Sequence, residues 1–148
     1  MKMSKQEKIL FLNGYRFRLN MVRQLTQELQ ELRETVMRIT PFLSSMPGSG
    51  GPNLHRLEQS VEQVEQVQER LAEELEKAIL AQTQVQAVIE TLEDERLRQV
   101  LRSRYILGQT WEKAAETLGL EERWVRRLHE RALMELNLEC DEMPQKAG

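Results

Sequence analysis

Cysteine, aromatic residues and long apolar runs are all scarce in this chain of 148 residues. The single cysteine, Cys140, has no partner within the chain, which excludes an internal disulfide and a cysteine-ligated metal site. Aromatic residues are 5% of the total, fewer than a β-sandwich or barrel uses. No apolar run approaches the roughly 20 residues that cross a bilayer, and no apolar segment of a secretion signal follows Lys2 and Lys5. The sequence therefore predicts an all-α protein of the cytoplasm.

The residue types that carry most enzyme chemistry are also few. The two histidines, His55 and His129, lie far apart, and neither belongs to a pair with the spacing of a helical metal site. The chain has two aspartates, no glycine-rich phosphate loop and no pairing of a nucleophile with a base. We therefore expect no enzyme activity, no bound metal and no cofactor.

Charge is distributed unevenly, although the net charge is only −3. Residues 1–53 carry a net charge of +4, residues 54–95 of −8, residues 96–133 of +4 and residues 134–148 of −3. A polyanion meets the local field rather than the net charge, so the two basic blocks are compatible with a nucleic-acid partner. The acidic tail at residues 139–148 is expected to be disordered.

Two long segments have the apolar spacing of helices that pack lengthwise. Three-four spacing links six apolar residues of the first: Val22, Leu25, Leu29, Leu32, Val36 and Ile39. The same spacing runs from Leu54 to Leu92 in the second, with Gln68 and Gln82 as polar exceptions. Because the first segment is basic and the second acidic, we expect them to form an antiparallel helical, coiled-coil hairpin over residues 1–92. A parallel dimer is the alternative, and dimerisation of hairpins stays open.

The connector between these segments, residues 40–53, reads TPFLSSMPGSGGPN. Its prolines and glycines are expected to end both helices and to leave a flexible link. A functional loop is the alternative interpretation, since Phe42, Leu43 and Met46 are unusual in a mere spacer.

The sequence of residues 93–138 predicts three shorter helices. Gly108 is expected to end the first, Thr110 to cap the second and Gly119 to end the second after about two turns. A third, longer helix starts near Glu121. A short helix, a glycine turn and a longer helix make a helix-turn-helix.

A projection of the third helix at 100° per residue separates a buried face from an exposed one. The residues expected to face inward are Val125, Leu128, Ala132 and Leu136. Arg123 and Arg127 fall on the opposite side, with Arg126 at its edge, where guanidinium groups can bond guanine edges or phosphates. Trp124 lies on the flank, where it would contact DNA backbone or pack on the first helix, and we expect packing. An ordinary solvated helix face is the alternative for the arginines.

The run from Arg104 to Gly119, followed by Val125, Leu128 and His129, resembles region 4 of bacterial sigma factors over about residues 93–137. That region binds the −35 promoter element through a helix-turn-helix. The resemblance implies a small three-helix DNA-binding domain at residues 93–138. No sigma region 2 is present, so no recognition of the −10 element is implied.

The whole chain resembles small phage and prophage transcription regulators, which have a connector like that at residues 39–51. This resemblance implies double-stranded DNA as partner and a bacterial host cell as setting. The helical hairpin is expected to serve as a dimerisation arm or as a contact for RNA polymerase, and the location is expected to be the host cytoplasm. Carried over by position, the DNA-facing residues are Glu122, Arg123, Arg126 and Arg127. A packaging protein like a terminase small subunit and a helical adaptor that does not bind DNA are the alternative functions.

Overall fold

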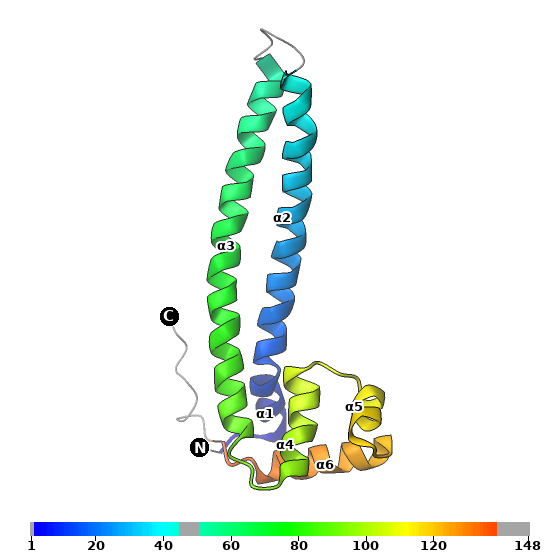
Figure 1. The fold of residues 1–148 in the computed structure, drawn as a ribbon. Helices are drawn as coiled ribbons and strands as arrows, with labels where there is room; N and C mark the ends of the chain where they lie inside the picture. The colour runs from blue at the N-terminus through cyan, green and yellow to red at the C-terminus, as the bar shows by residue number, and fades with distance from the viewer. Residues whose placement is uncertain (1, 45–50, 139–148) are drawn as a thin grey trace. The chain divides into compact units, whose positions relative to one another are not determined.

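The computed structural model describes residues 2–44 and 51–138, and these residues form helices joined by turns (Figure 1). The helices are α1 (Lys5–Leu12), α2 (Gly14–Ser44), α3 (Gly51–Ile89), α4 (Glu95–Leu101), η1 (Arg102–Ile106), α5 (Trp111–Leu118) and α6 (Glu122–Glu135). Two long helices followed by a small helical domain confirm the predicted all-α class. Within the described part of the chain, no helix has the length and apolarity needed to cross a membrane.

The chain divides into two compact units, which are described separately. Residues 1–18 and 78–148 form one, the composite unit, and residues 19–77 form the other, the hairpin unit. Both α2 and α3 contribute residues to both units. The boundary proposed from sequence, at residue 92, lies inside the composite unit. The physical reason is that the end of α3 shares its core with the helices that follow.

In the hairpin unit, α2 and α3 run antiparallel and side by side (Figure 1). Leu25 and Leu29 of α2 are buried against Val67 of α3. Leu32, Val64 and Leu71 are partly buried around them. The predicted apolar row of α2 therefore supplies the contact, as its spacing indicates.

Only part of the predicted apolar row of α3 is covered by packing against α2. Leu57, Val64 and Leu71 are partly buried, and the buried row beside them contains Ser60 and Val67. Leu57, Val64 and Leu71 lie between that buried row and the other predicted seam residues, Leu54, Val61 and Leu75, which are 41–46% exposed. The predicted row 54–57–61–64 and the row that is covered, 57–60–64–67–71, both have three-four spacing, so periodicity alone does not choose between them. The packing against α2 decides which row of α3 is buried.

The break between the long helices is shorter than the predicted connector at 40–53. Helix α2 continues to Ser44 with Pro41 inside it, and α3 begins at Gly51. Proline near a helix end removes one backbone bond, and the Thr40 Oγ1 hydroxyl donates to the Val36 carbonyl in the same turn, at 2.8 Å. Residues 45–50, which include Met46, and the side chains of Phe42 and Leu43 lie outside the described residues, as does the tail at 139–148.

The composite unit has a broad core, to which the N-terminal helix and the end of α3 both contribute. Its members are Leu12, Val85, Ile89, Leu92, Leu97, Val100, Leu101, Tyr105, Ile106, Ala114, Ala115, Val125, Leu128, Ala132, Leu133 and Leu136. Helix α1 begins with a capping box between Ser4 and Glu7. It is joined to α6 by Lys8 Nζ, which donates to the Leu133 carbonyl at 2.7 Å, and by an ion pair between Lys5 and Glu130 at 2.6 Å. The N-terminal helix is thus part of the small domain.

Candidate nucleic-acid interface

The first helix of the small domain begins regularly and ends in a wider turn. Asp94 caps α4 by accepting from the Arg96 backbone amide at 2.9 Å. From Arg102 the helix widens into the π-helical turn η1, which ends at Ile106, and the chain then turns at Gly108, which has a φ of 68°. This left-handed backbone angle favours glycine, and a Cβ here would also force the Arg16 guanidinium, the end of a flexible side chain, to move. The sequence predicts the stop at Gly108 but not the widened turn.

Helix α5 and the turn after it follow the predicted pattern. The Thr110 Oγ1 accepts from the Lys113 backbone amide at 3.1 Å and caps the helix. Gly119 has a φ of 69°, and the amides of Leu120 and Gly119 donate to the carbonyls of Ala115 and Glu116 at 3.0 and 3.3 Å. This pair of bonds is a Schellman motif, which needs a left-handed residue at the glycine position. The turn between α5 and α6 is therefore fixed locally.

Helix α6 presents the two faces that the projection predicts. Val125, Leu128, Ala132 and Leu136 are buried in the core of the composite unit, with α5 lying beside α6 (Figure 1). Glu121 is the N-cap residue and makes no capping hydrogen bond through its side chain. The helix therefore starts without the hydroxyl cap that the resemblance would supply, and its N-terminal end carries two carboxylates, those of Glu121 and Glu122.

The four residues carried over as DNA-facing are all exposed on α6, but they differ in their partners. Arg123 Nε pairs with Glu121 Oε2 at 3.1 Å, and Arg126 Nη2 bonds Glu122 Oε1 at 2.9 Å. Among the described residues Arg127 makes no ion pair, and its guanidinium carbon lies 5.2 Å from the ring centroid of Trp124. Exposed ion pairs hold a side chain weakly, so a phosphate or base edge can replace either glutamate.

Two arginines, Arg104 and Arg126, lie over the ring of Trp111 at the start of α5. The sequence did not indicate this arrangement. The guanidinium carbons of Arg104 and Arg126 lie 4.1 and 4.9 Å from the ring centroid of Trp111. Arg104 Nη1 donates to the Gln109 carbonyl at 2.7 Å, and its buried Nε has no partner among the described residues. Burial is the main cause that lowers the pKa of Arg104; Tyr105 opposes the shift and the charge of Arg126 adds to it. The π-helical turn and the ring contact bring these residues together, and neither has a sequence signal.

A buried tyrosine–histidine pair joins α6 to η1. Tyr105 Oη and His129 Nε2 lie 2.7 Å apart, and the Trp111 ring meets the imidazole edge-on at a centroid distance of 4.9 Å. Burial lowers the pKa of His129 to about 4 and raises the pKa of Tyr105 to about 12. Both groups are therefore neutral at physiological pH and act as structural supports of the helix that carries the arginines.

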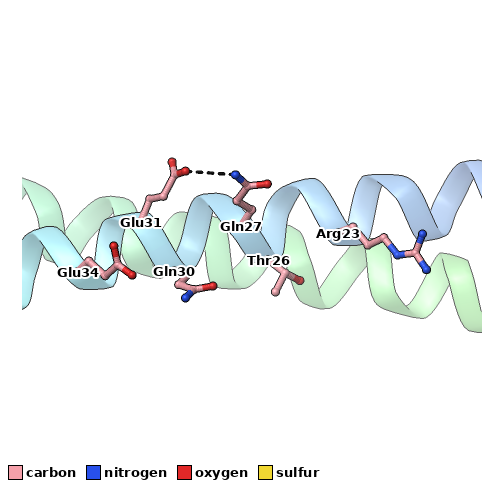
Figure 2. Close-up of a pocket in the computed structure, with 6 residues that line it drawn as sticks. All are labelled: Arg23, Thr26, Gln27, Gln30, Glu31 and Glu34. Carbon is pink, nitrogen blue, oxygen red and sulfur yellow. Dashed lines mark hydrogen bonds between the residues drawn. The ribbon is translucent and has the colours of Figure 1, made fainter.

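Among the described residues, the remaining surface features are less well defined as a binding site than the arginine face of α6. Figure 2 shows a depression on α2 in the hairpin unit, lined by Arg23, Thr26, Gln27, Gln30, Glu31 and Glu34. All six are exposed polar side chains of one helix, and Gln27 donates to Glu31 at 3.4 Å. In the described part of the chain, no group of three or more His, Cys, Asp or Glu is arranged to hold a metal ion.

The small domain is similar to a known family. Residues 89–137 match the family model for Sigma-70, region 4. The match begins at the last residue of α3 and ends just after α6, so it spans the capped helices, the glycine turn and the arginine face. This part of the chain is a sigma region 4-like helix-turn-helix, which is a DNA-binding module and not a catalytic one. Comparisons with curated proteins and with solved structures gave no match.

Proposed function

We propose that this protein is a DNA-binding transcription regulator of phage type that recognises promoter DNA through α6. The observation that carries the proposal is the row of exposed arginines on the outer face of the second helix of a region 4-like helix-turn-helix. A helix of this kind fits the major groove of B-DNA, where each base pair presents a distinct pattern of donors and acceptors.

The partners of each arginine support a division of roles. Arg123 and Arg127 lie on the outer face, so they are the proposed contacts to base edges. Arg126 and Arg104 both lie over the ring of Trp111 at the side of the helix, so they are the proposed phosphate contacts. Glu122 holds Arg126 in the absence of DNA and is displaced when a phosphate arrives.

The hairpin unit is proposed as the arm that contacts another protein. The exposed apolar row of α3, which contains Leu54, Val61 and Leu75, supports this role. The partner that covers this row is either a second copy of the chain or RNA polymerase. Sedimentation of the pure protein separates these, because a dimer at micromolar concentration indicates a second copy. A ring of eight or more copies would instead favour the packaging function.

The decisive test is selection of bound DNA from a random duplex pool with the full-length chain, followed by affinity measurements. Changing Arg123, Arg126 and Arg127 together to alanine should weaken binding to the selected DNA by roughly 100-fold or more. Each change should cost under about 0.5 kcal/mol of stability because the side chains are exposed.

The matched control removes the same charge elsewhere. Arg23, Arg33 and Arg38 are exposed on α2 in the hairpin unit, and their joint replacement by alanine should leave the affinity within about twofold. Equal losses in the two triple variants would show that only net charge matters. Unchanged affinity in the α6 variant would refute the role of α6.

A further inference from the structure

The most exposed aromatic surface of the helix-turn-helix is the indole of Trp124. Its side chain belongs to the first turn of α6, is 47% exposed and does not pack against the core of the composite unit. The sequence predicted that it would pack on the first helix, whereas the structure places it outside the core with almost half of its surface exposed. A large apolar ring among charged side chains is poorly placed for stability, since its burial would be favourable.

A guanidinium lies over the ring, and the arginine that carries it is unlike the other two arginines of this face. Arg127 lies over the indole at 5.2 Å, whereas Arg123 and Arg126 are held by carboxylates. Among the described residues Arg127 forms no hydrogen bond or ion pair, so its five donors are directed to solvent. Contact with a flat ring restricts the side chain while leaving the donor edge of the guanidinium accessible.

The two residues are close enough along α6 to reach neighbouring base pairs. Residues three apart on a helix are separated by about 60° around its axis and about 4.5 Å along it. Successive base pairs of B-DNA are about 3.4 Å apart. Two neighbouring side chains on this face can therefore meet two adjacent base pairs.

We propose that Trp124 and Arg127 together read a two-base-pair step in which a guanine lies next to a thymine. Arg127 bonds O6 and N7 of the guanine, and the indole covers the 5-methyl group of the thymine, the one apolar feature of the major groove. The inference rests on the proposed function and adds the identity of the bases that this side of α6 recognises. It makes Trp124 a specificity-determining residue.

The experiment uses the duplex obtained from the selection and changes single atoms of the DNA. Uracil in place of thymine removes only the methyl group, 7-deazaguanine in place of guanine removes the N7 acceptor, and inosine removes only the minor-groove amino group. The uracil change should weaken binding about fourfold, the effect of exposing one methyl group. The 7-deazaguanine change should weaken it roughly tenfold, and inosine should have little effect.

Protein variants then show which side chain is responsible for each effect. In Trp124→Ala the uracil and thymine duplexes should bind equally, and Trp124→Phe should retain part of the difference. In Arg127→Ala the effect of 7-deazaguanine should disappear. Phe17→Ala is the matched control, because Phe17 is exposed with Arg18 over its ring at 5.8 Å but lies outside the helix-turn-helix. This variant should keep both the preference for thymine over uracil and the preference for guanine over 7-deazaguanine.

The outcomes separate this inference from the proposed function. If the three-arginine variant loses binding but uracil has no effect at any position, Trp124 does not read thymine and the proposed function stands. A selected site without a guanine next to a thymine also overturns the inference alone. If the selection yields no sequence preference, both fail. Melting curves of each variant show whether a lost discrimination reflects unfolding.

Discussion

The composite unit and the hairpin unit each contain part of α2 and part of α3, yet they bury side chains to very different extents. In the composite unit, helices from both ends of the chain enclose a core in which Leu12, Leu97 and Val125 are fully buried. In the hairpin unit, two helices meet along one narrow row, and Leu75 keeps almost half of its surface exposed. An unbroken heptad pattern therefore does not imply uniform packing, because the number of neighbouring helices sets how much of each row is covered.

The largest expected effect tests whether the N-terminal helix belongs to the DNA-binding domain. Leu12→Asp would place a charge in the core of the composite unit, and we expect it to cost several kcal/mol and to unfold that unit. Leu10→Asp changes a neighbour that is 75% exposed and should be almost silent. Trp111 and Trp124 both lie in the composite unit, so tryptophan fluorescence during urea unfolding reports on it selectively. Similar stability of the two variants would contradict the shared core.

The second prediction concerns pH, and it again distinguishes the units. The pKa of His129 is lowered from 6.5 to about 4 in the folded state, so between these values the unfolded chain binds more protons. Stability of the composite unit should therefore be complete above pH 6.5 and fall by about 3 kcal/mol as the pH drops to 4. The measurement is the fluorescence-detected unfolding midpoint across this range.

The control for this pH effect is His129→Gln, which keeps a polar group beside Tyr105 and removes the titration. Its unfolding midpoint should depend less on pH between 6.5 and 4 than that of the parent, although its stability at pH 7 is lower because the tight contact with Trp111 is lost. An equal pH dependence in both proteins would assign the effect to other groups.

The third prediction compares two leucines of the hairpin unit that the heptad pattern treats alike. Leu29→Ala removes a buried contact of α2 and should lower the stability of the hairpin by about 2–3 kcal/mol. Leu75→Ala removes an exposed side chain and should cost less than about 1 kcal/mol in the monomer. Helical signal by circular dichroism at low protein concentration measures both. A larger loss for Leu75→Ala would mean that the exposed row is covered by a second copy in solution.

The smallest expected effect concerns the electrostatics of α6. Glu122→Gln removes the carboxylate that holds Arg126 and lowers the negative charge at the start of the helix. DNA affinity should rise about two- to fourfold at low salt, with little change in stability, because an exposed ion pair contributes under about 1 kcal/mol. Glu130→Gln, also on α6 but paired with Lys5, is the comparison and should have a smaller effect. A fall in affinity for Glu122→Gln would mean that the carboxylate itself contacts DNA.

Local chemistry made much of the small domain predictable. The cap at Thr110, the left-handed turn at Gly119 and the inward side of α6 around Val125 all follow from residue types within a few positions of one another. These features depend on backbone angles and on helical periodicity, which a short stretch of sequence specifies. The family match at residues 89–137 agrees with that local pattern.

Long-range contacts decided the remainder. The helical class, the helix-turn-helix and the exposed arginines follow from the amino-acid sequence, because each depends on neighbours along the chain. Three features became visible only in the packed molecule: Leu12 completes the core, Arg104 shares the ring of Trp111 with Arg126, and Trp124 is exposed. They depend on packing because the burial of a side chain is set by the helix that covers it. A three-four pattern gives the face of a helix and does not say whether one neighbour, several or none will pack against it.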